Sequence, residues 1–413
     1  MGLVVSATII LSRLGGIPYQ NGAKSVAISE CRQPSLISWC FLHQNTDFAI
    51  FSSGQCLVEG WCSQMFLKNY WYCAALPEEI TKTPLRRIIC NLPVVFYRDT
   101  DGRPVALEDR CSHRQAPLST GKICDDSIQC LYHGFVFDRN GKCIYIPHQK
   151  KISQRAHIHS YPIEEKWGFI WIWIGESVDA KPEKIPFLPW TKNPNHSAVF
   201  LYYHVKANHQ LVADNLLDIS HADYLHSDTL GSKSGVMDGP QPDKVEFRTW
   251  REGDEIHSFR KLTNVEVASF PKKWGNFSKK VDRTNIQMWE APNNVHVHLE
   301  FENEENKILL NHDHIITPET EKTSHYFMDF TRDFALKGDR YPTDDDIYEE
   351  QYSVINGDDI PMIEAQQDNI DLCEGVTDVP VKADKLISEV HRHLTKLYRQ
   401  QGLKISPYIV GKG

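Results

Sequence analysis

The chain has 413 residues, of which 41% are hydrophobic and 24% charged, so it is long enough for two domains with their own cores. Its formal net charge is −9 and its pI is about 6.1, which excludes the basic field that a nucleic acid or an anionic membrane would need. Eleven cysteines in a chain of this length do not form a disulfide framework, so we expect free thiols and a reducing, cytoplasmic environment.

Residues 1–64 differ from the rest of the chain. They show little helical or strand periodicity. The apolar run Leu3–Leu11 is too short to cross a bilayer and lacks the basic flank of a signal peptide. Met65 then opens a segment that looks like a natural amino terminus. We therefore predict that residues 1–64 are an N-terminal extension, either disordered or the product of a misplaced start codon.

Short strands and tight turns are expected next, between residues 86 and 175. Asp-Gly and Asn-Gly between apolar segments are strong hairpin signals. Two such signals are present: Asp101-Gly102 lies between 86–98 and 103–108, and Asn140-Gly141 lies between 134–138 and 143–146. The apolar segment Trp167–Ile174 is expected to be a buried strand that closes this unit. We therefore predict a β-rich domain over residues 65–180.

Two short Cys/His motifs lie in loops of this β-rich domain, Cys111-x-His113 and Cys130-x-x-His133, separated by sixteen residues. Two thiolates and two imidazoles define the Rieske [2Fe–2S] cluster, in which the cysteines hold one iron and the histidines the other. Zinc is the alternative, because two Cys and two His also complete a tetrahedral site. The usual zinc spacing, however, pairs Cys with Cys and His with His. The four residues therefore predict a Rieske cluster.

A proline-rich segment, Pro182–Pro194, is expected to lead into a second domain over residues 181–413. Helices are expected around 208–226 and 343–372, and the tail Lys382–Arg399 carries an amphipathic stripe. Six segments with alternating polarity are expected to form one antiparallel sheet: 198–205, 244–251, 256–261, 285–289, 295–301 and 308–316. The predicted fold class is α+β, with a β-rich Rieske domain followed by an antiparallel sheet flanked by helices.

The segment Asp214–His226 contains a second set of candidate metal ligands. Asp218 and His221 are three residues apart and share a helix face, whereas His226, five residues beyond His221, would point away from a straight helix. Both imidazoles reach one metal only if the helix ends or distorts between them. Two histidines with a distant carboxylate form the facial triad of mononuclear Fe(II) oxygenases. Beside a Rieske motif, we prefer this interpretation to a pair of surface or core histidines.

The carboxylate ligand is expected from the later helix. Asp359 falls on an apolar stripe, and a carboxylate that faces a core needs a partner, which iron would supply. Gly357 and Pro361 are expected to kink or break the helix here. Asp358 and Asp368 are the alternatives, in that order. The stripe consists of Tyr348, Tyr352, Ile355, Met362 and Ile363.

Over about residues 65–400 the chain resembles the Rieske non-heme iron oxygenases, specifically the oxygenase component of the vanillate and dicamba O-demethylase type. The family usually has proline where Ser112 and Leu131 stand, and these positions affect only the surroundings of the cluster. The segments that carry the resemblance are Trp71–Glu79, Cys111–Ser119, Gln129–Gly134, Asp214–His226, Thr317–Glu321 and Ser324–Phe327.

The resemblance implies roles for several residues. Asp359 takes the third iron-ligand position, Asn215 approaches the iron from outside the ligand set, and His314 lines the substrate pocket. The family forms a head-to-tail homotrimer, in which an acid corresponding to Asp218 bridges His221 of one subunit and the cluster ligand His133 of its neighbour. A helix acid with a local hydrogen bond, and a histidine on a sheet face, are the alternatives for Asp218 and His314.

The resemblance also implies an activity. The chain is expected to use O₂ and two electrons to hydroxylate or oxidatively demethylate a small, aromatic substrate. Because the sequence has no Gly-rich dinucleotide fingerprint and no four-Cys ferredoxin spacing, the electrons are expected from a separate NAD(P)H-dependent flavin/[2Fe–2S] reductase, directly or through a ferredoxin. The alternatives are a ring-hydroxylating dioxygenase with the same metals and a Rieske electron-transfer protein, a class that ends after the cluster domain.

Overall fold

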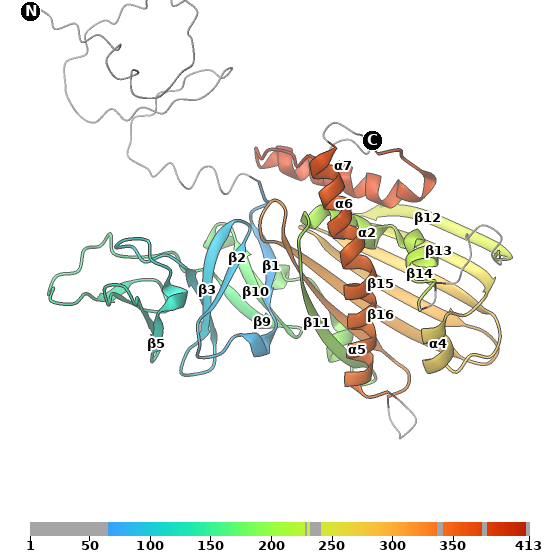
Figure 1. Ribbon diagram of the computed structural model, residues 1–413, viewed down its shortest axis with the longest axis horizontal. Coiled ribbons are helices and arrows are strands. Elements are labelled where there is room, and N and C mark those ends of the chain that lie inside the picture. Colours follow the sequence, from blue (N-terminus) through green and yellow to red (C-terminus); the bar gives the residue numbers. More distant parts are fainter. Residues whose placement is uncertain (1–64, 228, 232–240, 337–341, 374–377, 410–413) are drawn as a thin grey trace, which may run out of the picture. The chain divides into compact units, whose positions relative to one another are not determined.

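The computed structural model describes residues 65–227, 229–231, 241–336, 342–373 and 378–409. The prediction for residues 1–64 lies outside this part of the chain. The described residues form a β-rich region up to Ile174, followed by a seven-stranded antiparallel sheet with helices (Figure 1). The predicted α+β fold is therefore confirmed.

The first region contains three small antiparallel sheets, with strand orders β1-β10-β9, β2-β3-β4 and β5-β6-β7-β8. Its last strand, β10, is buried along its whole length, as the apolar sequence predicted. The strands are β1 (Tyr70–Ala75), β2 (Leu85–Ile89), β3 (Leu92–Arg98), β4 (Pro104–Glu108), β5 (Lys122–Cys124), β6 (Ser127–Gln129), β7 (Val136–Phe137), β8 (Cys143–Tyr145), β9 (Ile163–Lys166) and β10 (Phe169–Ile174).

Tight turns set the pairing of these strands. Gly102 and Gly141 have φ values of 80° and 79°, so both predicted hairpin turns use the left-handed backbone that glycine favours. The predicted strand over 86–98 is divided by a further turn, because Cys90 and Asn91 have φ values of 53° and 65°. Two consecutive positive values describe a type I′ turn, which cysteine rarely enters, so the sequence signal for this hairpin was weak.

The second region is built on one seven-stranded antiparallel sheet. All six predicted strands are present, and a seventh, β17, lies between β11 and β16. The prediction missed β17 because all nine of its residues are buried, which removes the polar–apolar alternation of a half-exposed strand. In spatial order the strands are β11 (Ser197–Val205), β17 (Ser324–Arg332), β16 (Lys307–Pro318), β15 (Asn294–Glu302), β14 (Val281–Glu290), β13 (Glu255–Val265) and β12 (Lys244–Glu252).

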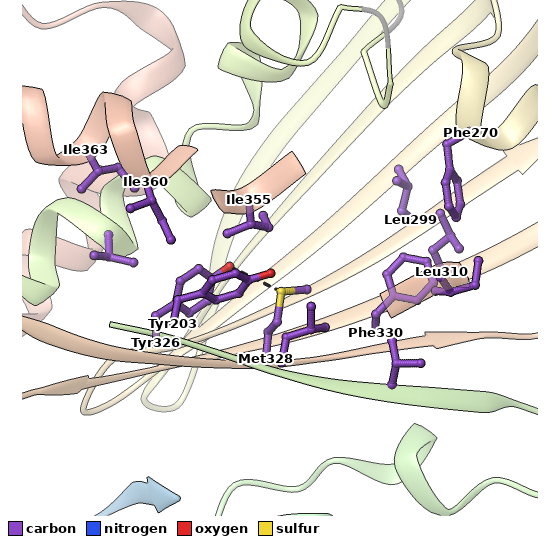
Figure 2. Close-up of a cluster of buried hydrophobic side chains, with 14 of the residues drawn as sticks. Tyr203, Phe270, Leu299, Leu310, Tyr326, Met328, Phe330, Ile355, Ile360 and Ile363 are labelled. Atoms are coloured by element: carbon purple, nitrogen blue, oxygen red, sulfur yellow. Dashed lines mark hydrogen bonds between the residues drawn. The ribbon is translucent and has the colours of Figure 1, made fainter. Parts of the chain in front are cut away.

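Both faces of β17 are covered. On one face Phe327 packs with Trp71 and Trp171 of the first region, and the Thr317 hydroxyl of β16 donates to the Cys73 carbonyl at 2.7 Å. On the other face Tyr326 and Tyr203 lie beneath isoleucines of the helices (Figure 2). Burial of β17 therefore ties the sheet to both the first region and the helices.

Helices cover the face of the sheet that carries the candidate site, and α5 and α6 run across the strands in Figure 1. No helix in the described part of the chain is long and apolar enough to span a bilayer. The helices are α2 (His209–Leu217), α3 (Ala222–Leu225), α4 (Ser269–Trp274), α5 (Asp344–Val354), α6 (Ile360–Leu372) and α7 (Lys385–Gln400). A π-helical turn, Ile355–Asp359, joins α5 to α6, and a 3₁₀ turn, Ile219–His221, joins Asp218 to α3.

The helix predicted over 343–372 is continuous but changes phase at the π turn. The extra residue per turn rotates the chain that follows, so Ile360 and Ile363 are buried while Met362 is 56% exposed. The assignment of Met362 to the buried stripe was therefore wrong. The tail helix α7 follows its predicted pattern, with Leu386 and Val390 packed among the buried residues around Trp289.

Candidate metal centres

The first candidate centre is made by two loops of the β-rich region, one after β4 and one between β6 and β7. The two loops have the same construction. The Cys111 N–H donates to the carbonyl of Ala116, five residues on, and the Cys130 N–H donates to the carbonyl of Phe135, each at 2.8 Å. Gly134 has a φ of 71°, which lets the second loop turn back to its strand. Each loop therefore holds its Cys and His in a fixed relation.

The thiols of this centre lie inside the protein and the imidazoles lie at its surface. Cys111 and Cys130 are 1% and 2% exposed, whereas His113 and His133 are exposed, with ring centroids 4.5 Å apart. Burial raises the pKa of Cys111 to about 11, and the adjacent Cys130 adds to the rise. A raised pKa disfavours the thiolate of Cys111 unless a cation lies beside it, so the paired loops suit a metal group.

The spacing of these donor atoms does not suit a single zinc ion. Among the described residues, only His221, His226 and Asp359 bring three donor atoms within 4.8 Å of one another. The four loop residues do not converge in this way, although one tetrahedral zinc would require it. A two-iron cluster spans a longer distance, with two ligands at each end.

The second candidate centre depends on a break in a helix. Helix α2 begins at an N-cap, where the Asn208 side chain accepts from the Gln210 N–H, and ends at Leu217. Asp218 has a φ of −96° and a ψ of 83°, and its Oδ1 accepts from the Ser220 N–H at 3.0 Å. The chain then restarts as a 3₁₀ turn followed by α3. This is the distortion that the spacing of His221 and His226 required.

The break brings the two histidines to the π turn. His226 Nε2 lies 3.1 Å from Asp359 Oδ2, and His221 Nε2 lies 3.5 Å from Asp359 Oδ1. Asp359 is 3% exposed, and His226 is 4% exposed. Two imidazoles and one buried carboxylate in this arrangement can hold an Fe(II) ion by the facial triad that the residue types suggested.

Neighbouring groups orient these three side chains. His221 Nδ1 lies 2.6 Å from the Asp218 carbonyl, and His226 Nδ1 lies 3.1 Å from Asp358, so each ring turns Nε2 toward Asp359. Burial lowers the pKa of His226, but the hydrogen bonds and charges of Asp359 and Asp358 outweigh it and raise the pKa overall. The Asn215 amide donates to Asp359 Oδ1 at 3.2 Å.

The alternative carboxylates lie elsewhere. Asp358 contacts the far nitrogen of His226 rather than joining the three converging groups, and Asp368 is exposed on α6. Asp218 is partly buried and lines a pocket of about 340 Å³ together with Asn215 and His221. The structure thus brings five of the predicted residues together around one point of the fold: Asn215, Asp218, His221, His226 and Asp359.

His314 lies on β16, on the same sheet face as the metal residues. It is 4% exposed, and its Nδ1 lies 2.7 Å from the hydroxyl of Tyr326. Burial lowers the pKa of His314 well below its usual value, so the ring is neutral. Burial also raises the pKa of Tyr326, and the charge of Asp359 adds to that rise. Tyr326 therefore contacts His314 and lies within reach of the charge of Asp359.

Sequence reasoning missed a row of polar residues on this sheet face. Arg283, Asn285 and Gln287 of β14 are each 2% exposed, and His312 of β16 is 8% exposed. Only the three residues of β14 alternate with exposed or half-buried residues, which places them on one face of that strand. The sequence did not indicate that this face carries α2 and α3.

Comparisons with known proteins agree with this architecture. Residues 70–162 match the Rieske [2Fe–2S] domain, and residues 205–400 match the vanillate O-demethylase oxygenase C-terminal domain. One relative is the toluene-4-sulfonate monooxygenase system iron-sulfur subunit TsaM1 of Comamonas testosteroni. The two sequences are 34% identical over 357 residues, and this alignment covers 83% of the present chain and 100% of TsaM1. The chain is 35% identical over 280 residues to the dicamba O-demethylase oxygenase component of Stenotrophomonas maltophilia, covering 66% of this chain and 80% of that protein.

A solved structure of dicamba monooxygenase bound to 3,6 dichlorosalicylic acid matches with a TM-score of 0.75 and 30% identity, over 82% of this chain and 100% of that one. The Rieske match, together with a related dicamba monooxygenase structure that contains non-heme iron, confirms both predicted cofactors. The names "oxygenase component" and "iron-sulfur subunit" describe these relatives as parts of multicomponent systems. An electron carrier would lack the second domain, so the chain is an oxidoreductase. It belongs to the Rieske non-heme iron oxygenases, in the group of the vanillate and dicamba O-demethylase oxygenase components.

Proposed function

We propose that this chain is the terminal oxygenase of a monooxygenase system that hydroxylates or oxidatively demethylates a small aromatic compound. The observation that carries this proposal is the convergence of His221, His226 and Asp359 in a chain that also has the two Cys/His loops. Relatives with the same two domains are named for vanillate, dicamba and toluene-4-sulfonate, which supports an aromatic substrate.

We assign the residues as follows. Cys111 and Cys130 hold one iron of the cluster, and His113 and His133 hold the other. His221, His226 and Asp359 hold the mononuclear iron. Residues 65–180 form the Rieske domain and residues 181–413 the catalytic domain, while residues 1–64 are an extension. The two cysteines are buried and the two histidines are exposed, which supports this assignment of the cluster ligands. An iron held by the histidines would lie at the surface, where a partner protein can reach it.

The two groups divide the chemistry, since the cluster supplies single electrons and the mononuclear iron activates O₂. The protein's own contribution is to hold the ligands and the substrate. Asp218 and Asp358 fix the rings of His221 and His226, and Asn215 orients Asp359. If the substrate carbon that becomes hydroxylated belongs to an O-methyl or N-methyl group, the product loses formaldehyde and leaves the demethylated compound.

His314 is proposed to line the substrate site. A neutral imidazole whose Nδ1 meets the Tyr326 hydroxyl keeps one ring nitrogen for a polar atom of the substrate. The alternative, a histidine that only packs on the sheet, is equally compatible with its burial. Binding of a phenolic substrate before and after His314→Phe distinguishes the two roles.

The assembly is proposed to be a head-to-tail homotrimer. Asp218 would bridge His221 and the neighbouring subunit's cluster ligand, and its position in the 340 Å³ pocket beside His221 supports this role. The pocket has an exposed apolar rim that includes Met362 and Val381. Leu131 and Tyr132, beside the proposed cluster ligand His133, are also exposed, so both surfaces have apolar side chains that a neighbouring subunit could cover.

Electrons would come from an NAD(P)H-dependent reductase, directly or through a ferredoxin, in the reducing cytoplasm that suits such a cluster.

The test is to supply the reconstituted enzyme with a reductase, NADH and a panel of methoxylated and N-methylated aromatic compounds, while O₂ uptake and formaldehyde are recorded. Demethylation predicts formaldehyde in proportion to the O₂ consumed. A ring-hydroxylating dioxygenase would consume O₂ and release hydroxylated or cis-diol products without formaldehyde. Turnover of no compound by an enzyme with both metal groups loaded would count against the proposal.

A further inference from the structure

The C-terminal helix α7 lies against the segment that carries the proposed iron ligands. Ile387 of α7 lines the pocket of about 340 Å³ together with Asp218 and His221. One helical turn further on, His391 is 4% exposed. Its Nε2 lies 2.9 Å from Oδ1 of Asp214, a residue of α2 that lines the same pocket. A residue 177 positions away in the sequence therefore contacts the helix that leads into the metal site.

The carboxylate of Asp214 is held by two donors. Asp214 is 6% exposed, and a buried carboxylate needs hydrogen bonds to offset its lost hydration. A carboxylate only accepts, so His391 donates from Nε2, and the Gln210 amide donates to the same oxygen at 2.9 Å. Gln210 belongs to the first turn of α2 itself, whereas His391 belongs to another helix. The bond from His391 therefore fixes Asp214, and with it the end of α2, against α7.

Backbone contacts connect Asp214 to a proposed iron ligand. The carbonyl of Asp214 accepts from the Asp218 N–H at 3.0 Å, which closes the last turn of α2. The carbonyl of Asp218 lies 2.6 Å from Nδ1 of His221 and so turns Nε2 of that ring toward Asp359. Three successive contacts therefore join α7 to the ring of His221.

Packing alone does not account for an imidazole at this place. The neighbouring buried positions of α7 hold Leu386, Val390 and Leu394, so an apolar side chain would suit the surroundings. Nδ1 of His391 is buried and has no hydrogen-bond partner within the described ranges of the chain. A buried ring nitrogen without a partner is unfavourable. The histidine is therefore explained by the bond that its other nitrogen makes.

We propose that His391 is a positioning residue of the mononuclear iron site: it holds Asp214, and through the end of α2 it fixes the direction of His221 Nε2. The inference rests on the proposed function, because it takes His221 as an iron ligand. It gives the C-terminal helix a part in metal binding, although the three converging donor groups come from other elements. Removing a group that orients a metal ligand typically lowers metal affinity by about 10- to 100-fold.

The experiment measures the Fe(II) affinity of the mononuclear site in the full-length protein with its cluster, by competition with a chelator. His391→Leu stays apolar and buried but removes the donor, so Fe(II) affinity should fall by about 10-fold or more. His391→Gln places an amide N–H near the position of Nε2 and should restore most of the affinity, whereas His391→Asn places it near Nδ1 and should not. Equal affinity in the wild type and in His391→Leu would overturn the proposal, and so would equal affinities of the Gln and Asn variants.

His393→Leu is the matched control. His393 is another buried histidine of α7, 2% exposed, but its ring packs edge-on against Trp289 and its Nε2 lies 3.8 Å from Asp254. General weakening of α7 should affect both variants, so the unfolding midpoint is measured for each. His391→Leu should lose Fe(II) affinity while His393→Leu keeps it. A loss of the same size in both variants would show that α7 acts through stability and would contradict the positioning role.

A double-mutant cycle tests the route through Asp214. If His391 acts through Asp214, adding His391→Leu to Asp214→Leu should lower the Fe(II) affinity no further, whereas additive losses would contradict this route. The visible spectrum of the cluster shows that each variant is folded. Failure of the wild type to bind Fe(II) beyond its cluster would refute the metal-site assignment itself, whereas normal binding in the wild type with unchanged variants would refute only the role of His391.

Discussion

At the scale of single residues, neighbouring groups orient the three side chains that we propose as iron ligands. The Nδ1 atom of His221 contacts the backbone carbonyl of Asp218, and the Nδ1 atom of His226 contacts the carboxylate of Asp358. Fixing one ring nitrogen decides both the tautomer and the direction of the other nitrogen. The three donor atoms are therefore already within 4.8 Å of one another before any ion is considered.

Asp359→Asn should remove the mononuclear iron without disturbing the cluster. A neutral amide is a poorer ligand for Fe(II) than a carboxylate, so total iron should fall by about one third and turnover should be lost. Iron analysis together with the EPR signal of the reduced cluster measures both quantities.

Asp358→Asn is the matched control for this change. It alters the neighbouring carboxylate, which contacts His226 from behind, so iron should be retained and activity should fall by about 10-fold. If Asp358→Asn lost the iron and Asp359→Asn kept it, the two assignments would have to be exchanged.

At the scale of elements, two irregularities in helices bring the three proposed ligands together. The break at Asp218 lets histidines five residues apart face one point, and the π turn Ile355–Asp359 sets the rotation of Asp359 relative to α5. Such π turns add one residue without ending the helix and often occur at functional sites. Neither Gly357 nor Pro361 breaks the helix, because Pro361 stands in the first turn of α6, where its missing N–H is tolerated.

Deleting Asn356, which is exposed within the π turn, should convert this turn to regular α-helix. The π turn already accommodates one extra residue, so its removal leaves Ile360 and Ile363 on the core face but shortens the turn that positions Asp359. Asp359 would then move away from His221 and His226. We expect loss of mononuclear iron with nearly unchanged helix content by circular dichroism. Asn356→Ala keeps the register and should retain the iron.

At the scale of the whole molecule, buried histidines couple stability to pH. Burial lowers the pKa of both His209 and His312 to about 4, against about 6.5 for an unfolded histidine. Between these values the unfolded chain takes up protons that the folded chain does not. The free energy of unfolding should therefore fall as pH decreases from 6.5 toward 4, by about 1.4 kcal/mol per pH unit for each histidine.

His209→Leu should reduce this pH dependence, measured as the change in unfolding midpoint between pH 7 and pH 5.5. His157→Leu is the control, because it replaces a histidine that is exposed rather than buried. An unchanged slope in the His209 variant would show that other groups cause the acid sensitivity.

The proposed trimer gives Asp218 its role between subunits. Asp218→Ala should leave both metal groups assembled, because Asp218 is not a ligand and its backbone carbonyl still orients His221. Electron arrival at the mononuclear iron should slow by about 10- to 100-fold, the range expected when a group that hydrogen-bonds a metal ligand is removed. Single-turnover oxidation of the reduced cluster measures this step, and a rate equal to wild type would contradict the bridge.

The sequence by itself determined the chemical groups and their order. Spacing alone selected Cys111, His113, Cys130 and His133, because a metal ligand set is a local pattern of residue types. Most strands were also predictable, since alternation with period two survives wherever one face of a strand is exposed. The same logic failed for β17, which is buried on both faces, and for the turn at Cys90-Asn91.

Only the tertiary structure decided which carboxylate joins the histidines and what lies around them. Asp358 and Asp359 are adjacent in sequence, and a π turn, which has no sequence signature here, turns Asp359 toward His226 Nε2 and Asp358 toward His226 Nδ1. Local patterns specify which groups are available, whereas contacts between distant segments depend on packing that no local pattern records.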